Sequence, residues 1–354
     1  MPKKLNILRL QLTVCSNSAP HHNFTLNTNK IYNITVCSFY KPEIKIPSNI
    51  NLHHGNGKII EFLFKLKYLL KKNSFDIIHA HTVHVAFLFI FISILFKWHS
   101  LNKSMFTVHN SFENYHFRNK LLFFITHWFF NKIVYCSNSS FNSFPEYFTK
   151  NKNKNFTIRN GLNIKKLSKS IKKAISLNNK IYKIIVVGRL VEIKQPYIII
   201  NAFLKILNNN VELNFIGDGD LKSNLILKNY KNVNFIGKLK REEVYKELYK
   251  SDLFISMSVT EGMPIAVLEA MAIGLPVVLS DIKAHREIVK NLNYTNLVPT
   301  NSEELLIEEI DRILNMPNNM LNNIRENNQN HIINNFSIDI MLKQYDKIYV
   351  ELAL

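Results

Sequence analysis

The sequence has few cysteines, few acidic residues and no long apolar run. Its three cysteines, Cys15, Cys37 and Cys136, form no CxxC pair and are odd in number. Nothing therefore predicts a disulfide framework, and we expect a reducing compartment. The longest apolar segment, 85–96, is about half as long as a membrane-spanning helix, and the N-terminus does not read as a signal peptide. These absences predict a cytoplasmic protein, either soluble or peripheral on the inner face of the plasma membrane.

Acidic residues are outnumbered by basic ones: 45 Lys and Arg stand against 26 Asp and Glu, which gives a formal net charge of +19. Such a charge favours anionic partners, and nucleic acid, acidic lipid and phosphorylated sugars are all candidates. No nucleic-acid-binding module is recognisable, so we expect no nucleic-acid partner. Much of the charge lies in Asn- and Lys-rich stretches. These form either solvated surface or a face that contacts an anionic membrane.

The chain is long enough, at 354 residues with 47% hydrophobic residues, to form two domains with proper cores. Apolar and β-branched runs predict strands at 5–14, 32–39, 75–81, 105–109, 132–137, 183–188, 213–219, 233–237, 252–257 and 275–279. The segment 83–98 reads as a helix that is apolar on nearly every face, either a buried crossover helix or a membrane-dipping surface. The segment 164–180 turns basic and loses its periodicity, as an interdomain connection would.

The most informative stretch is 260–280, TEGMPIAVLEAMAIGLPVVLS. Pro264 suits the first position of a helix, and Gly274 suits a left-handed residue after the helix end. The helix start presents backbone N–H groups from Met263 to Ala266 and the positive dipole end, so it suits an anionic ligand. Glu261 before the helix and Glu269 within it would accept hydrogen bonds from hydroxyl groups.

A second signal precedes it, in the stretch GRLVEIKQP. Gly188 follows a predicted strand and allows close backbone approach, and Arg189 and Lys194 come after it. Both cations can reach one point if the loop folds back, which is suitable chemistry for a diphosphate; the alternative is two exposed cations on a surface loop. Asp218 and Asp220 form a D-x-D further on, but we discount a metal site because the motif lies at a strand-to-helix turn deep in the second repeat.

The combination of E-G-x-P-x-x-x-x-E-A-M-A-x-G-x-P-V-V with G-R-x-x-x-x-K resembles retaining GT-B glycosyltransferases of family 4. The resemblance implies an α/β protein with the GT-B fold: two Rossmann-like domains, a cleft between them, and a C-terminal helix that crosses back to the first domain. We expect an acceptor-side domain at 1–165, joined by the helix at about 336–354, and a nucleotide-sugar-binding domain at 166–335.

The resemblance also assigns roles to residues. Arg189 and Lys194 would hold the diphosphate, Glu261 the sugar hydroxyls, and Glu269 the ribose. His109, which ends a predicted strand, would contact the donor sugar, with a structural histidine as the alternative. The other donor-binding candidates are Gly188, Lys238, Leu239, Met263, Pro264 and Ile265. The cationic side chains on the diphosphate imply that no metal or other cofactor is required.

The N-terminal loop departs from the family pattern. The family has a Gly-Gly loop after its first strand, whereas the stretch here reads CSNSAPHHNFTLN and has no glycine. Ser16 and Ser18 are the candidates for the acceptor and phosphate loop, through their hydroxyls and the backbone. A smaller departure is Gln195, which stands where the family has a glycine after the lysine.

The function that this resemblance implies is a retaining hexosyltransferase. It would move a sugar from a nucleoside-diphosphate donor to a glycan or lipid-linked acceptor, in cell-envelope polysaccharide or lipopolysaccharide biosynthesis. Two alternatives stay open: a non-catalytic GT-B subunit that stabilises a partner transferase, and a GT-B sugar-nucleotide epimerase. A nicotinamide dehydrogenase is poorly supported because no predicted strand is followed by GxGxxG.

Overall fold

The structure is a computed structural model and describes residues 4–15, 32–44, 46–48, 50–171, 181–206, 210–295 and 297–354. The chain divides into two compact units. The N-terminal unit comprises Met1–Gly161 and Ile338–Leu354, and the C-terminal unit comprises Leu162–Ser337. The divisions lie a few residues from those expected from the sequence.

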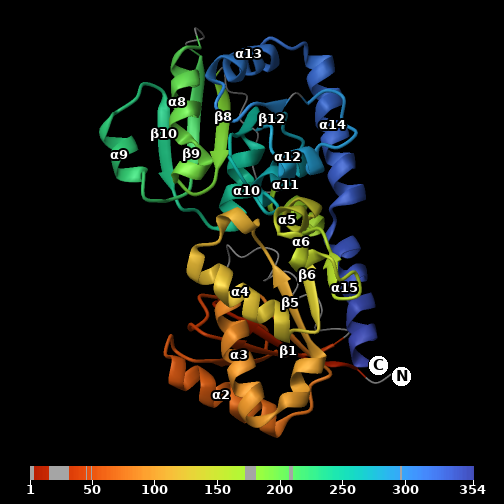
Figure 1. The fold of residues 1–354 in the computed structure, drawn as a ribbon. Helices are drawn as coiled ribbons and strands as arrows, with labels where there is room; N and C mark the ends of the chain where they lie inside the picture. The colour runs from red at the N-terminus through yellow and green to blue at the C-terminus, as the bar shows by residue number, and fades with distance from the viewer. Residues whose placement is uncertain are drawn as a thin grey trace. The chain divides into compact units, whose positions relative to one another are not determined.

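The N-terminal unit is built on a parallel sheet, whose described strands follow the order β3-β2-β1-β4-β5-β6-β7 (Figure 1). The strands are β1 (Asn6–Gln11), β2 (Asn33–Ser38), β3 (Asn51–His54), β4 (Ile77–Ala80), β5 (Ser104–Val108), β6 (Lys132–Tyr135) and β7 (Asn155–Thr157). β4 and β5 are buried along their whole length, as their short apolar sequences predict for a sheet covered on both faces. The short strand β3 was not predicted, because NLHH carries no apolar pattern.

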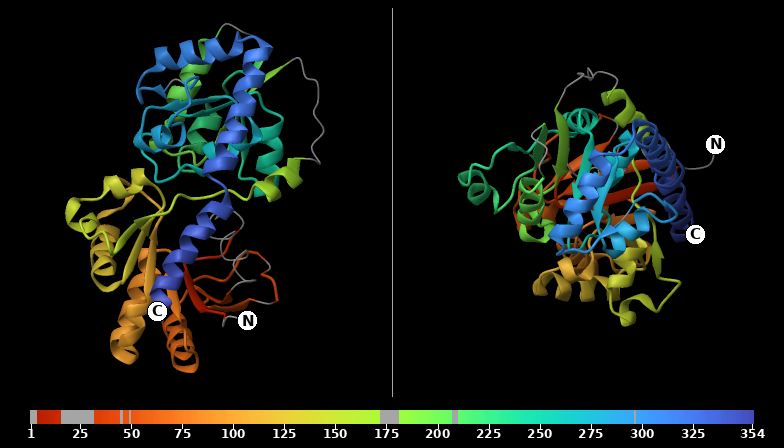
Figure 2. Two further views of the ribbon diagram at one scale, coloured as in Figure 1. Left: turned by 90° about the vertical axis from the view of Figure 1, so that its right-hand side faces the viewer. Right: turned by 90° about the horizontal axis from the view of Figure 1, so that it is seen from above.

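Helices cover both faces of this sheet. They are α2 (Ile59–Lys72), α3 (Val83–Phe96), η2 (Trp98–Lys103), η3 (Phe112–Asn114), α4 (Phe117–Phe129), α5 (Asn138–Ser143), α6 (Glu146–Thr149) and α15 (Ile338–Ala353). α2, α3 and α4 share one core with the strand residues Leu8, Ile78 and Phe106. α15 packs with Ile7 and Ile77 on the opposite face (Figures 1 and 2). The C-terminal helix therefore belongs to the N-terminal unit, as the resemblance implied.

The C-terminal unit contains a second parallel sheet, with the described strand order β10-β9-β8-β11-β12-β13. Its strands are β8 (Tyr182–Val187), β9 (Val211–Ile216), β10 (Val233–Gly237), β11 (Leu253–Ser256), β12 (Val277–Ser280) and β13 (Leu297–Val298). The order reverses between β8 and β11, which are hydrogen-bonded neighbours. Open α/β sheets bind their ligands at such a point, outside the carboxyl ends of the strands.

The helices of the C-terminal unit are α7 (Ile164–Ile171), η4 (Glu192–Lys194), α8 (Pro196–Leu204), α9 (Lys222–Leu227), α10 (Arg241–Tyr249), α11 (Ile265–Ile273), α12 (Lys283–Ile288), α13 (Glu303–Leu314) and α14 (Asn318–Asn335). α7 corrects an expectation, because the basic stretch after Ile164 starts as a helix. Its Leu167 is buried, and its Lys166 Nζ lies 2.9 Å from Glu242 Oε1 of α10. Tertiary packing thus overrides a weak local pattern.

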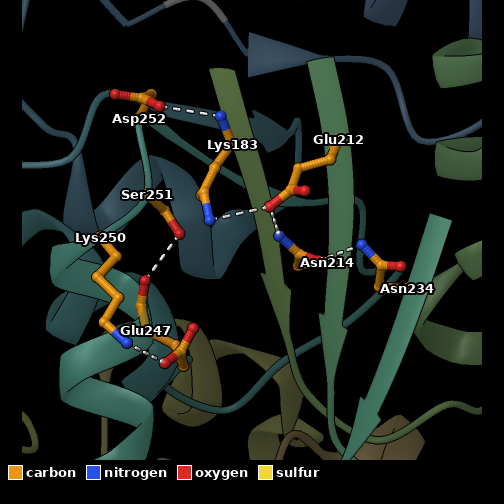
Figure 3. Close-up of polar contacts among 8 residues, drawn as sticks. All are labelled: Lys183, Glu212, Asn214, Asn234, Glu247, Lys250, Ser251 and Asp252. Atoms are coloured by element: carbon orange, nitrogen blue, oxygen red, sulfur yellow. Dashed lines mark hydrogen bonds and ion pairs between the residues drawn. The ribbon is translucent and has the colours of Figure 1, made fainter. Parts of the chain in front are cut away.

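A ladder of polar side chains fixes the register of β8, β9 and β10 on the face opposite the apolar core (Figure 3). Lys183 Nζ lies 3.2 Å from Glu212 Oε1, its partner in the adjacent strand. Asn214 donates to Glu212 over 3.0 Å and accepts from Asn234 over 2.9 Å. A slip by one residue would turn these polar side chains into the core, so the ladder specifies one register.

No helix of the described residues is long and apolar enough to cross a membrane. The fully apolar segment forms α3, which has 14 residues. One side of α3 is buried against the sheet, as Val85, Ala86 and Phe89 show, and the other side is exposed.

Candidate active site

The loop after β8 carries the two predicted cations. Gly188, Arg189 and Lys194 line one pocket of the C-terminal unit, together with Ser256 and Ser258 from the end of β11. Arg189 is exposed and forms no ion pair with any other residue that the structure describes. The backbone N–H of Val259 donates to the Ile193 carbonyl over 2.9 Å. This bond holds the loops after β8 and β11 together where the strand order reverses.

Two glycines on the neighbouring loop after β9 support the cationic loop. A Cβ atom on Gly217, whose φ is +147°, would lie 1.8 Å from the Gly188 carbonyl oxygen, and one on Gly219 would lie 2.4 Å from the Leu190 carbonyl oxygen. Only glycine permits such close backbone approach. The turn at 217–219 therefore packs against the backbone on both sides of Arg189 and helps to fix its position.

Asp218 of the D-x-D motif bonds to the turn and to the start of α9. Asp218 Oδ2 accepts from Lys222 Nζ over 2.9 Å, and Asp218 Oδ1 accepts from the Gly219 backbone over 2.9 Å. Across the described part of the chain, no group of three or more His, Cys, Asp and Glu residues is arranged to hold a metal ion. That the reaction requires no metal stays a prediction.

Glu261 lies beside Lys194 and forms an ion pair with it through Oε1. The same oxygen accepts from the Ser258 hydroxyl over 2.8 Å. Burial alone would raise the pKa of Glu261, but Lys194 reverses the effect and holds the pKa below its usual value. Glu261 is therefore ionised at neutral pH. A carboxylate beside a cationic pocket can accept hydrogen bonds from hydroxyl groups, as the sequence predicted for the donor sugar.

A buried chain of hydrogen bonds supports Glu261 and was not predicted. Ser280 Oγ at the end of β12 donates to the Ser258 carbonyl over 2.5 Å. His285 on α12 is fully buried, and its Nδ1 lies 2.8 Å from the Ser280 carbonyl, so Nδ1 carries a proton. Burial lowers the pKa of His285 to about 4. The ring is therefore neutral, and its Nε2 is a buried acceptor that bonds to none of the other described residues.

His285 also responds to the charges of the site, because Glu261 and Lys194 both affect its pKa. Glu261 raises this pKa and Lys194 lowers it. The sequence offered no signal for it, because a single histidine in KAHREI has no partner at a recognisable spacing.

Helix α11 begins one residue later than the sequence predicted. Pro264 is the residue before the helix rather than its first residue, and no side chain caps the helix start. Met263 and Pro264 are buried and Ile265 is half-buried. Gly274 ends the helix with φ 95°, in the left-handed conformation that the sequence predicted. Nothing tests whether the uncapped N–H groups bind an anion, so this stays a prediction.

Glu269 lies deeper in α11 and is fully buried. Its Oε2 accepts from Arg241 Nη1 over 2.8 Å. Burial raises the pKa of Glu269, and Arg241 offsets this only in part. In this structure the carboxylate therefore meets Arg241 rather than solvent, and ribose binding would require the pair to open. Lys238 is exposed and Leu239 is half-buried on the loop before α10, and their contact with a nucleotide base stays a prediction.

The remaining predicted residues belong to the N-terminal unit. His109 is half-buried, and its ring stacks on His81 with the centroids 5.7 Å apart. Its contact with a donor sugar stays a prediction. Ser16 and Ser18 lie outside the described residues.

His79, on the neighbouring strand β4, has a structural role. His79 is fully buried, with Nδ1 2.7 Å from the Tyr349 hydroxyl and Nε2 2.7 Å from the Thr107 hydroxyl. It connects the sheet to α15. His81 Nε2 lies 2.6 Å from Nη2 of the buried Arg9, and burial lowers the pKa of Arg9 to about 10.

Comparison with known proteins identifies the family. A family model described as glycosyl transferases group 1 matches residues 168–331, and one described as glycosyltransferase family 4 matches residues 14–166. The chain is 30% identical over 259 residues to the capsular polysaccharide biosynthesis glycosyltransferase CapH of Staphylococcus aureus, covering 68% of this chain and 69% of the relative. The chain therefore belongs to glycosyltransferase family 4, a family of sugar-transferring enzymes.

A second relative is the UDP-Gal:alpha-D-GlcNAc-diphosphoundecaprenol alpha-1,3-galactosyltransferase of Escherichia coli. It is 29% identical over 214 residues, which cover 56% of this chain and 54% of the relative. The match thus spans about half of the length of that relative. Among solved structures, Anabaena HepE in complex with UDP and glucose aligns with a TM-score of 0.78 at 16% identity, covering 98% of this chain and 100% of that chain. At this identity the likeness shows the fold, which is GT-B.

The backbone at Gln195 leads to a first prediction. Gln195 adopts φ 50° and ψ 50°, the left-handed conformation that costs a non-glycine residue about 1–2 kcal/mol. We expect Gln195→Gly to raise the free energy of unfolding of the C-terminal unit by about 0.5–1 kcal/mol, after the entropic cost of glycine. Hydrogen exchange of α8 peptides measures this. Gln195→Ala keeps the strained conformation and, like Gln195→Gly, loses the 2.7 Å hydrogen bond from the Gln195 side chain to Asn301 Oδ1, so a gain of equal size in that control would contradict the explanation.

The buried neutral His285 leads to a second prediction. Its pKa of about 4 lies below the ordinary value of 6.5, so the unfolded chain takes up a proton first as the pH falls. Stability should therefore fall between pH 6.5 and 5, by about 2 kcal/mol from this group. His285→Asn keeps a donor for the Ser280 carbonyl and cannot titrate. Urea unfolding at each pH should show a flatter dependence for this variant, and equal slopes for the two proteins would contradict the prediction.

Proposed function

We propose that this protein is a retaining glycosyltransferase. It transfers a hexose from a nucleoside-diphosphate donor to a lipid-linked or envelope glycan. The observation that carries the proposal is the arrangement at the strand-order reversal of the C-terminal unit. There, Arg189 and Lys194 line one pocket, and Glu261 is held beside Lys194 in an ion pair. Cations suit the diphosphate and a carboxylate suits sugar hydroxyls.

In the proposed reaction, the bond between the anomeric carbon and the β-phosphate oxygen breaks. The acceptor hydroxyl attacks from the same face, and its proton passes to the departing phosphate oxygen. No strong protein base is needed. Arg189 and Lys194 stabilise the charge that develops on the diphosphate, which is usually the largest contribution to catalysis. The start of α11 adds backbone N–H groups and the positive end of the helix dipole.

Glu261 acts on the sugar side. Because its pKa lies below the usual value, it is a carboxylate throughout the neutral range. It accepts hydrogen bonds from donor-sugar hydroxyls and favours positive charge at the anomeric carbon. Ser258 holds it in place over 2.8 Å.

The names of the curated relatives support the class of substrate. One is a capsular polysaccharide biosynthesis enzyme, and the other takes UDP-Gal and a diphosphoundecaprenol-linked acceptor. We therefore propose that this chain acts in the assembly of a cell-envelope polysaccharide. A panel of UDP-, GDP- and ADP-sugars, tested for binding and slow hydrolysis, identifies the donor. Binding without any hydrolysis or transfer would instead favour a non-catalytic subunit.

Two substitutions test the proposed mechanism. Glu261→Ala and Lys194→Ala should each lower the turnover of the identified donor about a hundredfold or more, as loss of one transition-state contact does. The matched control is Lys250→Ala. Lys250 also pairs with a glutamate, at 2.9 Å from Glu247, but it lies at the amino end of β11 (Figure 3). The turnover of the Lys250→Ala variant should be unchanged. Near-normal turnover in either site variant would remove that residue from the mechanism.

A further inference from the structure

The outer side of α4 is apolar, which is unusual for a helix that covers a sheet. Phe117, Leu121, Phe124 and Trp128 recur at helical spacing and are 83%, 57%, 50% and 72% exposed. The opposite side of the helix supplies the buried Phe123. A surface helix ordinarily turns charged residues outward. α4 is thus apolar on the side that packs and on the side that does not.

The neighbouring helix α3 extends this surface. α3 packs against α4 and has no charged residue over its 14 residues. Phe91, Ile94, Leu95 and Phe96 are 48%, 45%, 56% and 55% exposed. Figure 1 shows α2, α3 and α4 next to one another over one face of the sheet. We call the exposed apolar side chains of α3 and α4, together with Trp98, the apolar face.

Trp98 connects the two helices. It is 53% exposed, and its ring meets Phe129 of α4 edge-on, with the centroids 6.1 Å apart. The chain has two tryptophans, and both Trp98 and Trp128 belong to the apolar face. Tryptophan has an apolar ring with a polar N–H, which suits the boundary between lipid and water.

Basic residues lie close to the apolar face, on α4 and on the neighbouring helix α2. Between Lys58 and Phe129 the sequence has nine Lys and Arg residues but three Asp and Glu residues. Lys67 on α2 lies over the Phe96 ring, 3.8 Å from its centroid. Arg118 is exposed and Lys120 half-buried on α4 itself. Such residues can lay their apolar stems along lipid while their charges meet anionic headgroups.

We propose that the apolar face docks the N-terminal unit on the surface of an anionic lipid bilayer. α3 and α4 would lie in the plane of the membrane, with their aromatic rings at the depth of the headgroups. Charge complementarity selects this occupant, because an anionic membrane offers both an apolar interior for the aromatic rings and negative headgroups for Lys67, Arg118 and Lys120. The inference concerns lipid binding alone and does not depend on the proposed sugar transfer.

Sedimentation with sucrose-loaded vesicles of phosphatidylcholine and phosphatidylglycerol tests this proposal. The full chain should sediment with them at low salt, more weakly in 0.5 M NaCl, and weakly with phosphatidylcholine alone. The emission of Trp98 and Trp128 should shift to the blue in the same titration.

The doubly substituted variant Leu121→Glu/Trp128→Glu should bind at least about tenfold more weakly, because both changes place charge in the lipid. These positions are exposed, so circular dichroism should show an unchanged fold.

The matched control is Leu227→Glu, because Leu227 is 81% exposed on α9 of the C-terminal unit. It should bind vesicles as the unsubstituted chain does. The proposal is overturned if the unsubstituted chain stays in solution with anionic vesicles, or if the double variant binds equally well. It is also overturned if the chain forms a dimer that the double variant abolishes while neither protein binds vesicles. The apolar face would then be an interface between two copies. The vesicle assay contains no sugar nucleotide. A failure to bind vesicles is therefore distinct from a failure to transfer sugar.

Discussion

The ion pair between Lys194 and Glu261 is the interaction on which the candidate active site depends. Lys194 follows β8 and Glu261 follows β11, the neighbouring strands between which the strand order reverses. The pair holds Lys194, the proposed donor-binding cation, and Glu261, the proposed sugar-binding carboxylate, side by side, and each neutralises the other. In the proposed reaction, a diphosphate bound by Arg189 also attracts Lys194. Glu261 is then free to accept hydrogen bonds from the sugar. Binding of the diphosphate by Lys194 would thus favour binding of the sugar by Glu261.

The pair is supported by a group of buried, hydrogen-bonded residues. Ser258, Ser280 and His285 form a buried chain that fixes the Glu261 carboxylate. The two glutamates of the motif have opposite environments: Lys194 keeps the pKa of Glu261 low, whereas burial raises that of Glu269. The motif therefore combines one carboxylate that pairs with Lys194 beside the pocket and one that pairs with Arg241 in the core. In the proposed binding mode, the Arg241–Glu269 pair would have to open before Glu269 could meet a ribose.

The sequence predicted most of the fold because its strands are short apolar runs and its key helix has clear ends at Pro264 and Gly274. It also predicted that Arg189, Lys194 and Glu261 act together, since family motifs keep a fixed order along the chain. It could not predict the role of His285 or the Arg241–Glu269 pair, because these depend on contacts between distant segments. The exposed stripe of α4 was missed for another reason. From the sequence alone, a helix that is apolar on both sides is predicted to be buried. Only the structure shows that the sheet covers one side of α4 and leaves the other exposed.

The central claim is that Lys194 is shared between Glu261 and the donor diphosphate. Calorimetric titration of the identified nucleoside diphosphate, without its sugar, into the full chain and into Glu261→Gln tests it most directly. Removing the carboxylate charge frees Lys194 for the phosphates, so the account predicts that the variant binds the nucleoside diphosphate more tightly, by about tenfold for a gain of about 1.4 kcal/mol. Weaker binding by Glu261→Gln than by the unsubstituted chain would contradict it.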